Sequence, residues 1–195
     1  DIGLGIPAEP LFRSASGKSA FSYCKALLSP KFPETLRFID EGAYQRCEAI
    51  TEITIPVAID SIPSSPFIGC PIEKLVIADS RNLLKLHTSV GFRDLGSLKT
   101  LYIGRNYSYT IKPSIGYALF QNSKELESVT FGKYITEILE STFNNCQKLK
   151  EVTFGSNITN IGKHAFYNCG SLTSVSLPDG LTEIKENTFG YCEQL

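Results

Sequence analysis

Two hydrophobic periodicities alternate along the chain. In the clearest unit, four apolar residues follow one another at steps of four, four and three residues: Ile161, Ala165, Cys169 and Leu172. This spacing is typical of the apolar stripe of a short helix. Val175 and Leu177 then alternate with serines, which indicates a short, half-buried strand. Gly170 and Pro178 follow the two elements and favour turns there. One unit is therefore predicted to be a short strand, a turn and a short helix.

The same unit recurs through most of the chain. It carries an aromatic residue at a fixed place: Phe21, Tyr44, Phe67, Phe92, Phe120, Phe143, Phe166 and Phe189. The steps between them are 23, 23, 25, 28, 23, 23 and 23 residues, and a period of this length is typical of a solenoid. A single unit cannot bury both of its apolar faces, so the units are expected to stack with equivalent residues in rows.

The repeat also predicts the layers and the domain organisation. We expect an α/β solenoid with short parallel strands on its concave face and short helices on its convex face, because a row of helices is wider than a row of strands. Residues 1–19 are predicted to be a lead-in or N-terminal cap, and residues 20–195 a solenoid of about eight repeats. Residues 79–119 are degenerate and contain insertions, and the sequence stops at Leu195 in the middle of a repeat.

The repeat motif resembles a known family. The segment that begins at Ile158, ITNIGKHAFYNCGSLTSVSLP, carries the core I-x-x-x-A-F-x-x-C-x-x-L, and neighbouring units share it. This core and its 23-residue period are similar to the leucine-rich repeats of the BspA-like bacterial surface family. The resemblance implies a right-handed leucine-rich-repeat solenoid in a cell-surface or secreted protein that binds host or partner macromolecules.

The composition argues against two classes of function, nucleic-acid binding and membrane attachment. The chain has 19 Lys and Arg against 20 Asp and Glu, so its net charge is −1. Nucleic-acid binding and attachment to anionic membranes both rely on a large basic surplus, so neither is expected. The apolar runs are only a few residues long, which predicts no membrane insertion by this segment.

The six cysteines are the first candidates for chemistry: Cys24, Cys47, Cys70, Cys146, Cys169 and Cys192. All occupy one place in the repeat, and Leu95 and Ser123 stand there in two other units. A place that accepts leucine is a packing position, so we predict buried free thiols. Metal sites use pairs of Cys or His at short spacing, and we find none, so no metal or cofactor is predicted. A bridge between neighbours such as Cys146 and Cys169 stays open at this point.

A binding surface is predicted on the exposed side of the strands. Strand alternation turns the residues before and between the apolar pair outward, in two rows along the sheet. From these rows we select the candidate partner-binding residues Thr54, Lys74, Val76, Tyr102, Thr130, Glu151, Thr153 and Ser176. The alternative is that Thr and Ser are simply favourable on an exposed strand.

The insertion adds two further candidates, Tyr107 and Tyr109. Tyrosine is enriched at binding hot spots, and insertions in solenoids leave the stack as loops. The alternative is a degenerate repeat whose tyrosines fill the core. With no catalytic residues recognised, we expect a non-catalytic, extracellular module that binds a protein of the host or the extracellular matrix in the manner of an adhesin. The alternatives are a carbohydrate or cell-wall binding module, or a structural spacer for a domain elsewhere in the parent chain.

Overall fold

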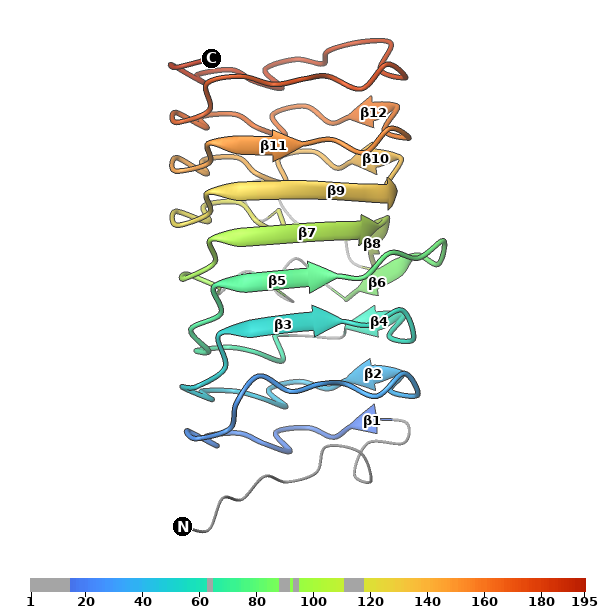
Figure 1. Cartoon of the computed structure of the whole chain (residues 1–195), viewed down its shortest axis with the longest axis vertical. Helices are drawn as coiled ribbons and strands as arrows, with labels where there is room; N and C mark the ends of the chain where they lie inside the picture. The colour runs from blue at the N-terminus through green and yellow to red at the C-terminus, as the bar shows by residue number, and fades with distance from the viewer. Residues whose placement is uncertain (1–14, 63–64, 88–91, 93–94, 111–117) are drawn as a thin grey trace.

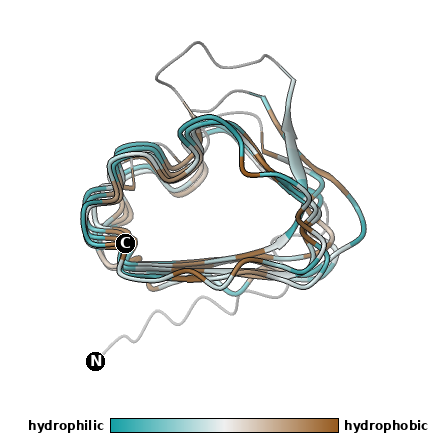
Figure 2. Ribbon diagram, turned by 90° about the horizontal axis from the view of Figure 1, so that it is seen from above, coloured by the Kyte–Doolittle hydropathy of each residue, from teal (hydrophilic) through white to brown (hydrophobic). Residues whose placement is uncertain are grey.

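The computed structural model is a solenoid of stacked coils that runs from the N-terminus at one end to the C-terminus at the other (Figure 1). It describes residues 15–62, 65–87, 92, 95–110 and 118–195. Seen along the stack, the coils follow nearly one outline around a shared interior (Figure 2). The predicted lead-in lies mostly outside the described residues, so its role as a cap stays a prediction.

One five-stranded parallel sheet forms a side of the stack, in the order β11-β9-β7-β5-β3. Its strands are β3 (Glu52–Ile55), β5 (Lys74–Ile77), β7 (Thr100–Arg105), β9 (Ser128–Tyr134) and β11 (Glu151–Thr153). Buried and more accessible residues alternate in β3, β5 and β11, as in the EITI of β3, and in the first four residues of β7 and β9. β-Branched and aromatic residues dominate these strands, because they pack well on a pleated, half-buried surface.

Two smaller sheets, which the sequence did not predict, line a second side of the stack. One has the order β1-β2-β4-β6-β8 and contains β1 (Ala15–Ser16), β2 (Phe38–Ile39), β4 (Ser61–Ile62), β6 (Leu84–Leu86) and β8 (Tyr107–Tyr109). The other pairs β10 (Glu137–Ile138) with β12 (Asn160–Ile161), again in parallel. These strands are two or three residues long, so alternation over so short a length gave no signal.

The third side is built of turns, which corrects the prediction of short helices. Within the described ranges, no residue is helical. Hydrogen bonds from the amide of Cys146 to the carbonyl of Phe143 (3.2 Å) and from Asn144 to Ser141 (3.1 Å) close single turns. Ser141 and Asn145 have positive φ values of 57° and 64°, and residues in this left-handed region interrupt any α-helix.

The amides that a helix would use internally point to the next coil instead. The Phe143 amide donates to the carbonyl of Ala165 at 2.8 Å, and the Asn145 amide donates to Tyr167 at 2.8 Å. Residues with right-handed and left-handed backbone conformations alternate here, so these amides all point toward the following coil. The spacing that suggested a helix therefore reflects two successive turns whose apolar residues point inward.

The aromatic residues form the predicted row inside the stack. Ring centroids of Phe120, Phe143, Phe166 and Phe189 follow at 5.7, 5.3 and 5.4 Å, with interplanar angles of 6–10°. Phe21, Tyr44 and Phe67 stack in the same way at 5.2 and 5.6 Å. Offset stacking adds to the free energy gained from burying these rings. The in-register rows confirm that residues 23 positions apart become neighbours.

A buried arginine ties three coils together. Arg105 ends β7 with a fully buried side chain, and its guanidinium donates to the carbonyls of Pro56 at 2.9 Å and Val57 at 3.2 Å. Burial lowers the pKa of Arg105, and the Asp60 carboxylate raises it. The arginine spans from its own coil to the second coil before it. Sequence patterns did not predict this residue, because an isolated arginine reads as a surface residue.

Candidate functional site on the sheet face

The outward residues of the large sheet form the two predicted rows, which we call the sheet face. In the first row Thr54 pairs with Val76, Val76 with Tyr102, Tyr102 with Thr130, and Thr130 with Thr153. In the second row Lys74 lies between Glu52 and Thr100, and Glu151 pairs with Ser128. The registers predicted from the sequence are thus confirmed, whereas the binding role of these residues stays a prediction.

The rows differ in accessibility along the sheet. Thr54, Lys74, Glu151, Thr153 and Ser176 are exposed, whereas Val76, Tyr102 and Thr130 are half-buried by their neighbours. Ser176 lies beyond the last assigned strand of this sheet. The sheet face is therefore mainly small and polar, with its bulkiest side chain, Tyr102, near the middle.

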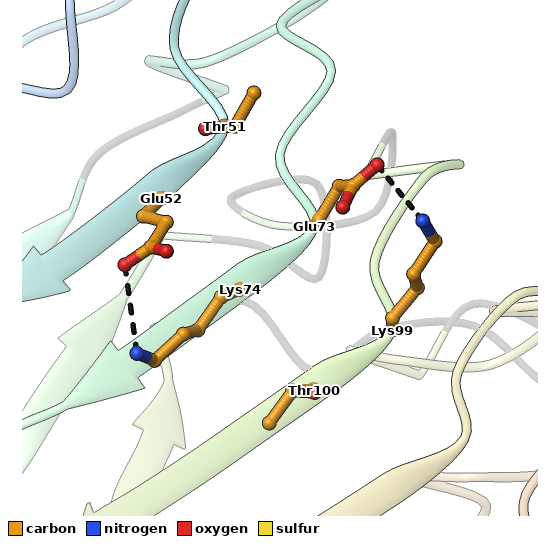
Figure 3. Close-up of a pocket in the computed structure, with 6 residues that line it drawn as sticks. All are labelled: Thr51, Glu52, Glu73, Lys74, Lys99 and Thr100. Atoms are coloured by element: carbon orange, nitrogen blue, oxygen red, sulfur yellow. Dashed lines mark hydrogen bonds and ion pairs between the residues drawn. The ribbon is translucent and has the colours of Figure 1, made fainter.

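A shallow pocket of about 230 Å³ opens where β3, β5 and β7 begin (Figure 3). It is lined by Thr51, Glu52, Glu73, Lys74, Lys99 and Thr100. Ion pairs cross between coils here, from Lys99 to Glu73 at 2.9 Å and from Lys74 to Glu52 at 3.5 Å. Because these side chains are exposed and solvent screens their charges, the pairs contribute little to stability. The pocket has no net charge, so it favours no ligand of one sign.

Tyr102 is anchored at the opposite end of the strands. Its hydroxyl donates to the Asp79 carboxylate at 3.0 Å. Partial burial raises the pKa of Tyr102, and the hydrogen bond to Asp79 raises it further. Both groups lie against Gly132, where a Cβ atom would come within 2.3 Å of the carboxylate and 2.5 Å of the hydroxyl. A glycine here therefore leaves room for the Asp79–Tyr102 pair.

The structure corrects the expected position of the insertion tyrosines. Tyr107 is only 4% exposed, and its hydroxyl shares a hydrogen bond of 2.9 Å with Thr142. The Tyr109 hydroxyl accepts a hydrogen bond from the Leu119 amide at 3.1 Å, and burial raises the pKa of both tyrosines. Their rings pack at the core because β8 joins a sheet of the coil wall, so they fill the degenerate repeat. Tyr117 and most of the insertion lie outside the described residues.

Four of the six thiols are buried as predicted, and two are not. All six are free, and Cys47, Cys70, Cys146 and Cys169 are buried, but Cys24 is exposed and Cys192 only half-buried, because both lie in outer coils. Buried thiols donate to the carbonyl of the aromatic residue 26 positions earlier, as from Cys70 to Tyr44 at 2.9 Å. In an in-register row the Cβ atoms are about 4.8 Å apart, wider than the roughly 3.5–4.5 Å of a relaxed disulfide.

Thiol reactivity provides a direct check on this arrangement. Burial raises the pKa of Cys146 to about 12 and that of Cys47 to about 11, whereas a hydrogen bond with the Cys169 thiol lowers the pKa of Cys192. We expect an aromatic disulfide reagent to label Cys24 and Cys192 in the folded protein, and all six thiols in denaturant without reductant. Labelling of Cys192 should begin at a lower pH than labelling of an ordinary thiol, because its pKa is lowered and the thiolate is the form that reacts. Fewer than six thiols in denaturant would show a disulfide, and Cys192→Ser serves as the control.

Several residues of the site were not predicted from the sequence. They are Asp79, which holds Tyr102, and the partners in the cross-coil ion pairs, Glu52, Glu73 and Lys99. The ion pairs follow from the repeat, since opposite charges 22 or 26 positions apart become neighbours. Asp79 was harder to predict. The only sign in the sequence was that the segment containing it is two residues longer than the same segment of the neighbouring repeat.

Solved structures show the same architecture. The chain is similar to a leucine-rich repeat protein of T. pallidum, with 22% identity over 82% of this chain and 71% of that chain and a TM-score of 0.59. It is also similar to a leucine-rich repeat protein of Eubacterium ventriosum, with 21% identity over 91% of this chain but 40% of that chain and a TM-score of 0.52. At these identities the likeness shows the fold alone.

Sequence comparison identifies the family. A search of curated proteins found no significant match. The family model for the BspA type leucine rich repeat region matches residues 14–114 and 113–195, which together span the coils and the degenerate stretch. This chain therefore belongs to the BspA-type leucine-rich repeat family.

Proposed function

We propose that the chain is a non-catalytic binding module that presents the sheet face to a partner protein. The observation that carries the proposal is the unbroken register of Thr54, Val76, Tyr102, Thr130 and Thr153 across five strands. Short polar side chains on a rigid sheet lose little conformational entropy when a partner covers them. Leucine-rich repeats are typically protein-interaction scaffolds, which agrees with this role.

The proposed setting is the cell surface or the extracellular space, with an adhesin-like role. Its support is the family membership, together with a composition that provides no basic surplus for nucleic acid. Within the part of the chain that the structure describes, no helix could cross a membrane. A partner of standard size would cover about 800 Å² of this protein, and so would extend beyond the five strands of the sheet face.

The test places two bulky charged residues on the sheet face. A Thr54→Arg, Thr153→Arg variant should lose at least about tenfold in affinity for a partner from a panel of purified extracellular matrix proteins, since each arginine displaces it from the sheet. Surface plasmon resonance with immobilised protein measures the loss.

The matched control carries the same added charge on the turn side, where Ala26 and Gln147 are exposed. An Ala26→Arg, Gln147→Arg variant should bind within twofold of the unmodified protein. Circular dichroism checks that both variants fold. Equal affinity of the sheet-face variant and the unmodified protein would rule out this surface as the binding site.

A further inference from the structure

One corner of the solenoid departs from the repeat. At the corner where the chain leaves β9, the next buried residue after Gly132 is Ile135, three positions later. At the same corner after β5, the next buried residue after Ala78 is Leu84, six positions later. The longer segment, residues 78–83, projects from the stack beside β5 and β6 (Figure 1). We call this segment together with Tyr102, Lys133 and Tyr134 the corner cluster.

The projecting segment leans over the next two coils. Asp79 accepts its hydrogen bond from Tyr102 in the following coil and reaches the backbone of Gly132 in the coil after that. The guanidinium carbon of Arg81 lies 5.9 Å from the ring centroid of Tyr134, and the Lys133 ammonium lies 4.9 Å from it. Two cations thus gather around one aromatic ring at the carboxyl ends of the longest strands.

These cations differ from most others on the surface. Seven lysines of the described residues pair with glutamates of the neighbouring coil, as Lys148 does with Glu125 at 2.7 Å and Lys163 with Glu186 at 2.9 Å, whereas Lys31, Lys85 and Lys124 do not. Among the described residues, Arg81 and Lys133 have no ion pair, and both are exposed. Repeat stacking supplies no carboxylate for them, so their charge is available to a ligand.

We propose that the corner cluster binds an acidic polysaccharide, a function beyond the protein binding proposed for the sheet face. Arg81 and Lys133 supply positive charge for a sugar carboxylate or sulfate. The rings of Tyr102 and Tyr134 offer apolar surface with a polar tip, which suits the mixed C–H and hydroxyl faces of a sugar. The Asp79 carboxylate oxygen that Tyr102 does not use can accept a hydrogen bond from a sugar hydroxyl.

The experiment compares three oligosaccharides by isothermal titration calorimetry on the full chain. The probes are a glucuronate-containing hexasaccharide, a sulfated hexasaccharide and a neutral N-acetylglucosamine hexamer, and the first two distinguish a carboxylate from a sulfate ligand. We expect saturable binding of at least one acidic probe, and at least tenfold weaker binding of the neutral one. Arg81→Gln and Lys133→Gln should each weaken binding about fivefold, and Lys124→Gln, an exposed lysine of the turn side, should leave it unchanged.

Three results would overturn the proposal: no acidic probe binds, the neutral probe binds equally, or both glutamine variants bind like the unmodified protein. Tighter binding of polyglutamate than of either acidic sugar would replace the glycan by an acidic protein partner, and so also overturns it. The Thr54→Arg, Thr153→Arg variant should keep its affinity for the sugar, and the glutamine variants their affinity for the protein partner. Failure of either proposal is thereby distinguishable from failure of the other.

Discussion

Replacement of Phe143 with alanine should lower the free energy of unfolding by about 3–5 kcal/mol. Phe143 is fully buried, and its ring stacks on Phe120 and Phe166 and meets the edge of Phe131 at 5.9 Å. Because the Phe143 ring stacks on one ring from each neighbouring coil, a cavity in the middle of the aromatic row weakens two interfaces together. Urea denaturation followed by circular dichroism measures the change.

The control is Phe38→Ala in β2, because Phe38 is 41% exposed and contacts no such row. Its cost should stay below about 1 kcal/mol. If both variants lost the same free energy of unfolding, the stacked aromatic interior would not be the main source of stability. If coupling acts mainly between neighbouring coils, the unfolding transition of Phe143→Ala should broaden, because the two halves of the stack would unfold separately.

A methyl group added at Gly104 is expected to destabilise the stack by about 3 kcal/mol. An ideal Cβ there would lie 2.4 Å from the amide nitrogen of Asp79 and 2.7 Å from the carbonyl carbon of Ala78. Both are backbone atoms of the preceding coil, so relief requires two coils to separate rather than one side chain to move. Gly104→Ala should also disturb the Asp79–Tyr102 hydrogen bond, because it displaces Asp79.

Gly96→Ala is the matched control, since a Cβ at Gly96 meets nothing within 4 Å. Loss of glycine flexibility in the unfolded chain should make this variant neutral or more stable by up to about 1 kcal/mol. Thermal unfolding of the two variants, compared with the unmodified protein, gives the answer. A stable Gly104→Ala protein would mean that the coils are spaced more widely at this corner than the structure has them.

The repeat period alone was enough to predict the stacking, the parallel large sheet and the row of aromatic rings. Inward residues were predictable because one face of each unit must be buried, as for Phe166 and Cys169. The turn side was predicted wrongly, since apolar steps of three and four residues do not distinguish a helix from successive turns. The distinguishing feature is a left-handed residue in each turn, and its signal was asparagine, which favours this region and recurs every 23 residues at Asn122, Asn145 and Asn168.

The site was predictable only as far as it repeats. Rows such as Val76 and Tyr102 follow from the period, and so do their registers. Asp79 and Arg81 belong to a corner with extra residues, and the path of such a segment depends on what it contacts several coils away. The burial of Tyr107 depends likewise on a space left by a neighbouring unit that the sequence does not show.

The turn side also gives the stack a direction. Amides of one coil donate to carbonyls of the following coil throughout, as from Phe21 to Ala43, Tyr44 to Pro66 and Phe166 to Thr188. Each coil thus offers only donors to one neighbour along this edge and only acceptors to the other. Head-to-tail addition satisfies both sets, whereas a twofold axis that joined like ends would oppose donor to donor. Association of coils through this edge is therefore directional, because the donor edge of one coil fits only the acceptor edge of another.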